Sequence, residues 1–119
     1  MTDLIACLGS GKGSWSHVKR LVEEGDWMSI YLITDEFGLK NFESDNKKIN
    51  FIITNFETPA KEIRENIKKQ LSGKIKDLEI ALNLVSGSGK EHMAILSALL
   101  QLGLGIRLMA VTKDGVREI

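Results

Sequence analysis

Cysteine and proline are almost absent from this sequence of 119 residues, which contains one of each. A single thiol, Cys7, excludes a disulfide scaffold within the chain, and we expect it in the interior as a small apolar residue. The two histidines stand apart, and Asp35 and Glu36 make no metal-ligand spacing. We therefore expect no metal centre and no cofactor, and interpret Asp35 mainly as a turn residue that could still contact a ribose or a cation.

An excess of charge is also lacking, because 16 Lys and Arg residues balance 16 Asp and Glu residues and the formal net charge is +0. Proteins that coat long nucleic acids bind phosphates with many basic residues, so this balance argues against that function. Any anion bound by this chain must be held by donors that are concentrated locally.

Long apolar runs are missing as well. The longest mostly apolar stretch, residues 93–104, is shorter than the roughly 18 residues needed to span a bilayer. The apolar run at residues 4–8 is too short for a signal peptide, so we expect a cytoplasmic protein. A chain of this length can bury about two-thirds of its unfolded surface in one core, and we expect a single domain over residues 1–119.

What the sequence does contain is an alternation of strand and helix patterns. Apolar runs rich in β-branched residues predict strands over residues 4–8, 29–34, 49–55, 80–85 and 106–111. Apolar residues at helical spacing predict helices over residues 15–24, from Thr58-Pro59 to Gly73, and over residues 91–102. In the second of these helices we expect Thr58 as the N-cap and Pro59 at the first helical position. Residues 35–48 are a crossover with a weak helical pattern, and a turn at residues 113–115 predicts a short antiparallel strand over 116–119.

This alternation predicts an α/β fold, a Rossmann-like three-layer sandwich with a mostly parallel sheet and a C-terminal antiparallel hairpin. In the strand order 3-2-1-4, the first and fourth strands are neighbours. The crevice at the carboxyl ends of two such strands is where folds of this type bind ligands.

Two similar loops fall at those strand ends, LGSGKGS at residues 8–14 and VSGSGKE at residues 85–91. Each precedes a predicted helix and offers glycines for close backbone approach, free amides at a helix start, serine hydroxyls and one lysine. This combination favours phosphate binding, and Lys12 and Lys90 with two helix dipoles would make a positive site on a neutral protein. A glycine-serine loop after a strand is also a common tight turn, which is the structural alternative.

Neither loop is a P-loop, because Lys12 is followed by Gly13 and Lys90 by Glu91, where that motif requires serine or threonine. The dinucleotide fingerprint G-x-G-x-x-G is also unmet, since Ser14 stands at its last position.

The stretch NLVSGSGK at residues 83–90, followed by an Ala- and Leu-rich helix, a strand and a terminal hairpin, resembles the CARF (CRISPR-associated Rossmann fold) domains. These domains are sensors of cyclic oligoadenylates, and their fourth strand typically ends in [ST]-G-G-T-[KR]. Their first strand ends in a glycine and serine loop, here Leu8-Gly9-Ser10. Ser88 stands where the family usually has glycine, and Gly89 where it has threonine.

The resemblance implies a homodimer that binds a cyclic oligoadenylate, with the ring of phosphates over a joint cleft. The ligand-binding residues of each subunit would be Gly9, Ser10, Gly11, Lys12, Ser86, Gly87, Ser88, Gly89 and Lys90. The helix predicted over residues 91–102 independently favours pairing, because apolar residues surround nearly all of it. Burial by neighbouring elements of the same subunit would explain that composition equally well. We expect no membrane and no long nucleic acid as partners.

Whether the ring is only bound or also cleaved stays open at this point. Metal-independent cleavage by a ribose 2′-hydroxyl would need an in-line geometry and stabilised charge on the phosphoryl oxygens. Lys90 could stabilise that charge and Ser10 could position the phosphate, so these two are the candidate catalytic residues of a ring nuclease. Capping or solvent exposure is a simpler explanation for His17 and His92. The alternative function is a small Rossmann-like enzyme or binder acting on a mononucleotide or sugar phosphate.

Overall fold

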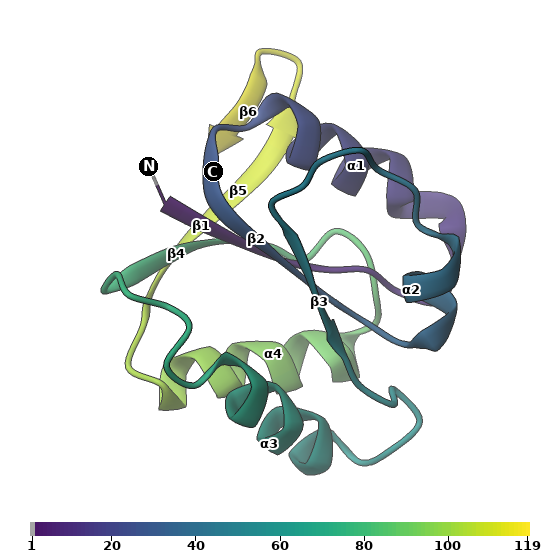
Figure 1. Ribbon diagram of the computed structural model, residues 1–119, viewed down its shortest axis with the longest axis vertical. Helices are drawn as coiled ribbons and strands as arrows, with labels where there is room; N and C mark the ends of the chain where they lie inside the picture. The colour runs from purple at the N-terminus through teal and green to yellow at the C-terminus, as the bar shows by residue number, and fades with distance from the viewer. Residues whose placement is uncertain (1) are drawn as a thin grey trace.

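A six-stranded sheet runs through the part of the chain that the structure describes, residues 2–119, and separates helices on its two faces (Figure 1). The structure is a computed structural model. Its strands are β1 (Thr2–Cys7), β2 (Trp27–Thr34), β3 (Ile49–Ile53), β4 (Glu79–Asn83), β5 (Gly105–Thr112) and β6 (Gly115–Glu118). Its helices are a 3₁₀ helix (Lys12–Ser14), α1 (Trp15–Glu24), α2 (Glu36–Asn41), α3 (Ala60–Leu71) and α4 (Gly89–Gln101).

The strand order is β3-β2-β1-β4-β5-β6, with β1 to β5 parallel and β6 antiparallel to β5. This confirms the predicted α/β, Rossmann-like sandwich with its C-terminal antiparallel hairpin. It also confirms that β1 and β4 are neighbours, since Leu4 is paired with Ala81 and Ala6 with Asn83. The carboxyl ends of the first five strands therefore meet along one edge of the sheet.

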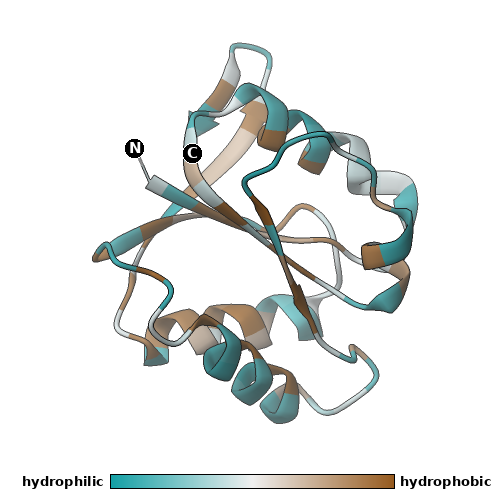
Figure 2. Ribbon diagram, viewed as in Figure 1, coloured by the Kyte–Doolittle hydropathy of each residue, from teal (hydrophilic) through white to brown (hydrophobic). Residues whose placement is uncertain are grey.

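Apolar side chains alternate along β1 between two cores, one on each face of the sheet. Leu4, Ala6 and Leu8 pack on the face covered by α1, whereas Ile5 and Cys7 pack on the face covered by α3 and α4. All five are fully buried. Figure 2 shows the matching pattern on the helices, with hydrophobic residues turned to the sheet and hydrophilic ones on the outer side of α3. A strand buried on both faces explains the unbroken apolar run in the sequence.

The crossover at residues 35–48 contains the short helix α2, which agrees with its weak helical pattern. Asp35 begins this helix, because one of its carboxylate oxygens accepts a hydrogen bond from Gly38 N at 3.0 Å. Gly38 is required here, since a Cβ at this position would lie 1.8 Å from Thr34 Oγ1. Asp35, which the sequence analysis interprets mainly as a turn residue, is therefore the N-cap of α2.

Two helix starts differ from their predicted positions. Helix α3 begins at Ala60 with Pro59 in the capping position, so the prediction that Thr58 caps this helix is wrong; the Thr58 hydroxyl instead donates to Asn55 O at 2.7 Å. Helix α4 begins at Gly89, two residues before the predicted start. Within residues 2–119, none of the helices has the length and apolar character needed to cross a membrane.

Candidate functional site

The first loop (residues 8–14) leaves β1 and enters α1 through the 3₁₀ helix. Gly9 is buried and fixed at both ends, because its N–H donates to Ser86 Oγ at 2.8 Å and its carbonyl accepts from Trp15 Nε1 at 2.9 Å. After Gly9 the loop is exposed, and a Cβ at Gly11 or Gly13 would meet nothing within 4 Å. A ligand can therefore approach this part of the backbone closely.

The second loop (residues 85–91) leaves β4 and includes the first turn of α4. Its conformation requires glycine at position 87, where φ is +104° and a Cβ would lie 2.7 Å from Cys7 Sγ. Ser88 and Glu91 then form a capping box: the Ser88 hydroxyl accepts from Glu91 N, and the Glu91 carboxylate accepts from Ser88 N at 3.1 Å. This reciprocal pair defines the start of α4.

The two loops are in contact at their first glycines. A Cβ on Gly9 would lie 2.7 Å from Gly87 Cα, so the two backbones approach as closely as only glycine permits. The Ser86 hydroxyl that holds Gly9 N reinforces this junction from the buried side. The loops therefore lie side by side at the ends of adjacent strands, as the strand order predicts.

A cavity of about 440 Å³ opens between the two loops, and we call it the loop cavity. It is lined by Gly9, Ser10, Gly11, Gly13, Ser14, Gly87, Ser88 and Glu91. Five of the nine ligand-binding residues predicted from the sequence are in this lining; Lys12, Ser86, Gly89 and Lys90 are not. Glu91 is the charged group of the lining, and its position at the start of α4 is favourable for a negative charge.

Both lysines of the loops are exposed and reach neighbouring structures. Lys12 Nζ lies 5.8 Å from the ring centroid of Trp15 and 5.7 Å from that of Phe37, in cation–π geometry. Lys90 Nζ donates to Thr58 O at 2.9 Å, in the segment before α3. Either ammonium group would have to change rotamer to contact an anion in the loop cavity.

The two candidate catalytic residues have separate hydrogen-bond partners. The Ser10 hydroxyl donates to Asp35 Oδ2 at 3.4 Å, whereas Lys90 is held by the carbonyl of Thr58. His92 Nε2 lies 2.7 Å from Ser86 O, so this ring helps to fix the second loop. His17 Nε2 accepts from Val111 N at 3.3 Å and therefore connects α1 to β5.

Cys7 lies beneath the second loop and is fully buried, as the sequence predicted. Burial, with smaller contributions from the nearby carboxylates of Glu91 and Asp35, raises the pKa of its thiol to about 12. A thiol with this pKa stays protonated at neutral pH, so Cys7 is a packing residue rather than a nucleophile.

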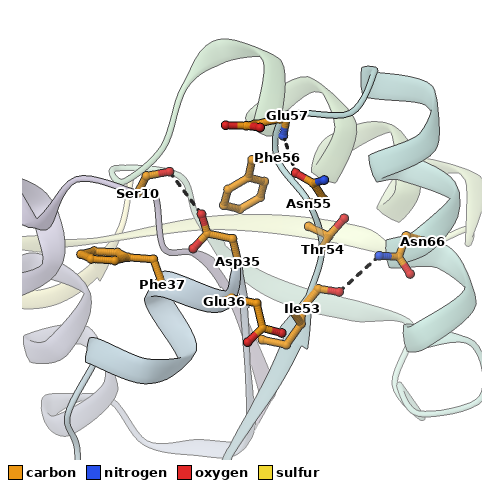
Figure 3. A pocket seen from close by; sticks show the side chains of 10 residues that line it. All are labelled: Ser10, Asp35, Glu36, Phe37, Ile53, Thr54, Asn55, Phe56, Glu57 and Asn66. Atoms are coloured by element: carbon orange, nitrogen blue, oxygen red, sulfur yellow. Dashed lines mark hydrogen bonds between the residues drawn. The ribbon is translucent and has the colours of Figure 1, made fainter.

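A second cavity, of about 460 Å³, lies at the carboxyl ends of β2 and β3, and we call it the acidic cavity (Figure 3). Its lining comprises Ser10, Asp35, Glu36, Phe37, Ile53, Thr54, Asn55, Phe56, Glu57 and Asn66. Three of these side chains are carboxylates and none is basic. Ser10 belongs to both cavities, so the two spaces adjoin at the first loop.

The sequence reasoning missed most of the acidic cavity, although one signal pointed to it. The sequence predicts the strand at residues 49–55, and in the parallel sheet its polar end at Thr54 and Asn55 lies beside the end of β2. The contributions of Glu57 and Asn66 depend on the path between β3 and α3, which no local pattern specifies.

In residues 2–119, no group of three or more His, Cys, Asp or Glu side chains is placed to hold a metal ion. Comparison with protein-family models gives no match, and neither does comparison with curated proteins. The fold and these comparisons together describe a small α/β domain with a mostly parallel sheet, without a family assignment.

Proposed function

We propose that this protein binds a cyclic oligoadenylate as a homodimer, with phosphates of the ring on the two glycine loops of each subunit. The observation that carries the proposal is the loop cavity, where two loops with the same GSGK sequence meet at the ends of β1 and β4. The resemblance of residues 83–90 to the CARF motif supports the choice of ligand.

The first loop supplies the most accessible contacts for a phosphate. Its Gly11 and Gly13 backbone is exposed and unobstructed, and the amides of Gly89 and Lys90 in the first turn of α4 have no partner within that helix. Lys12 and Lys90 belong to the two loops but lie outside the cavity lining, and they can add positive charge when their flexible side chains turn to a bound anion. Glu91 already accepts from Ser88 N, so phosphate contacts come chiefly from the first loop.

The homodimer is supported by an apolar stripe on α4. Ala94, Ile95, Ala98 and Leu99 of this helix are buried within the subunit. Met93, Leu96 and Leu100, at helical spacing on the other side, are exposed, with 70% of Met93 and 61% of Leu100 accessible. Because α4 starts at the second loop, a pair of subunits that buries this stripe brings two loop cavities near one another.

Calorimetry tests the ligand. We expect heat of binding with cyclic tetra-adenylate or cyclic hexa-adenylate and none with AMP, GTP or NAD. Lys12→Ala and Lys90→Ala should each weaken binding about tenfold or more, the loss expected for a charge-assisted hydrogen bond. Lys19→Ala, an exposed lysine of α1 outside both cavities, is the matched control. Binding of a mononucleotide with no heat from either ring would favour the alternative function instead.

Light scattering tests the dimer. Leu100→Asp places a charge in the proposed interface and should give a monomer. Leu78→Asp changes a leucine that is 83% exposed before β4 and should leave the dimer intact. A wild-type protein that is monomeric both with and without the ring would refute the homodimer.

A further inference from the structure

The acidic cavity is lined by three carboxylates, whereas the adjoining loop cavity has one, Glu91, and is lined mainly by the open glycine backbone proposed to hold phosphate. Asp35, Glu36 and Glu57 line the acidic cavity, and no lysine or arginine does. Carboxylates repel phosphate but accept hydrogen bonds from hydroxyl and amino groups. A ligand with phosphate on the first loop would therefore place its hydrogen-bond donors, rather than a second phosphate, in this cavity.

Thr54 offers the cavity a hydroxyl that is open to a ligand. Thr54 is only 4% exposed, yet its hydroxyl makes no hydrogen bond with any residue in 2–119. In residues 2–119, every side-chain oxygen or nitrogen that is closed off from solvent has a hydrogen-bond partner. The unpartnered Thr54 hydroxyl must therefore be accessible from the cavity. Thr54 lines the acidic cavity (Figure 3), so this hydroxyl is available to a molecule that enters it.

Aromatic rings provide a surface on which a planar base can stack. Phe37 lies at the edge of the cavity with 42% of its surface exposed, and its ring is supported by Trp15 at a centroid distance of 5.8 Å. Phe56 is buried and contributes a second apolar wall. Stacking of a base on an aromatic side chain is worth about 1–3 kcal/mol per base in nucleic-acid complexes.

The dimensions and the position fit the same kind of ligand. A volume of about 460 Å³ is within the range of small-molecule pockets. Ser10 lines both cavities, and Lys12 Nζ lies 5.7 Å from the Phe37 ring centroid, so a phosphate site and the stacking surface are adjacent. A nucleotide has this arrangement of an anionic group next to a donor-bearing sugar and a planar base.

We propose that the acidic cavity holds the nucleoside part, base and ribose, of a nucleotide ligand whose phosphate lies on the first loop. The base stacks on Phe37, and the carboxylates and the Thr54 hydroxyl take the donors of the ribose and the base amino group. This inference rests on the proposed function, because it takes the phosphate site at the loops from it. It adds that the carboxylates of the acidic cavity orient each nucleotide, so that its phosphate lies on the first loop and its nucleoside lies in the acidic cavity.

Variants at Thr54 test the cavity with cyclic tetra-adenylate as the probe. Thr54→Val retains the shape and removes the hydroxyl, and we expect affinity to fall roughly three- to tenfold, as for one hydrogen bond. Thr54→Ser retains the hydroxyl and should bind within about twofold of wild type. Equal affinities of wild type and Thr54→Val, with unchanged melting temperatures, would overturn the inference and leave the proposed function standing.

Adenosine alone provides the second measurement, because it lacks phosphate and tests the cavity independently of the ring. In amide NMR spectra we expect adenosine to shift Asn55 and Glu57 in the wild-type protein and to shift them less in Phe37→Leu. Shifts at these residues without any binding of the ring would refute the proposed function and retain the nucleoside site. Shifts confined to residues 9–13 and 86–91, or none, would overturn the nucleoside site.

Discussion

The two glycine loops share the tetrapeptide GSGK but differ in how their polar groups are used. In the second loop, Ser86 holds Gly9, Ser88 and Glu91 cap α4, and Lys90 is bound to a carbonyl. In the first loop, the Ser10 hydroxyl makes one long bond of 3.4 Å, and the backbone at Gly11 and Gly13 is open.

The difference teaches that a repeated sequence does not imply a repeated role. The second loop stabilises the fold, because its polar side chains are bound by the protein itself. The first loop is the part whose groups are free for a ligand. Substitutions in the second loop should therefore reduce stability, whereas substitutions in the exposed part of the first loop, after Gly9, should leave stability nearly unchanged.

The largest effect is expected at Gly87. Gly87→Ala combines a positive φ with a Cβ placed 2.7 Å from the buried Cys7 Sγ. Left-handed backbone and overpacking together should lower the free energy of unfolding by about 3 kcal/mol or more. Gly11→Ala, in the exposed part of the first loop, is the comparison variant, because φ is −91° there and a Cβ meets nothing. Urea unfolding should show it equal to wild type or slightly more stable; equal losses in both variants would contradict the comparison.

Ser86→Ala should have the next largest effect. The Ser86 hydroxyl is the partner of the buried Gly9 N–H, and its removal leaves that donor unsatisfied. We expect a loss of about 2 kcal/mol in the free energy of unfolding. Ser10→Ala removes an exposed hydroxyl with a long bond and should change stability by less than about 0.5 kcal/mol. A Ser10→Ala variant as unstable as Ser86→Ala would show that the first loop is structural too.

Helix capping should produce a smaller difference in stability between the two loops. Ser88→Ala removes the capping box of α4 and should cost about 1 kcal/mol. Ser14 occupies the capping position of α1, but its side chain makes no capping bond. Ser14→Ala should therefore lower the free energy of unfolding by only about a few tenths of 1 kcal/mol. Thermal unfolding of the two variants side by side measures the difference. A cost for Ser14→Ala as large as that for Ser88→Ala would place a cap at α1 as well.

This contrast marks the limit of what the sequence could predict. The strand order, the hairpin and the meeting of the two loops followed from apolar runs and glycine positions, because these are set locally and by the topology of parallel sheets. The partners of Lys12 and Lys90 did not follow, since they depend on Phe37 and Thr58, which are distant in sequence. The acidic cavity was missed for the same reason: Ser10, Asp35 and Thr54 meet only once the sheet is formed.

The smallest effect concerns His17, the histidine that follows the first loop. His17 Nε2 accepts from Val111 N, so the folded protein requires this nitrogen without a proton. Burial lowers the pKa of His17, and nearby Arg20 lowers it further. In the unfolded chain the pKa returns to about 6.5. Between these two pKa values the unfolded state binds more protons, so stability decreases as the pH falls below about 6.5.

Unfolding measured from pH 8 to pH 5.5 should therefore show a decrease that is smaller in His17→Gln than in wild type. Glutamine retains an oxygen that can accept from Val111 N, but it does not titrate. The exposed carboxylates are the same in both proteins, so their contribution cancels in the difference. The cost of the substitution itself is read at pH 8, where the histidine is neutral in both states. Identical pH dependence of the two proteins would mean that protonated His17 fits between α1 and β5 as well as the neutral ring does.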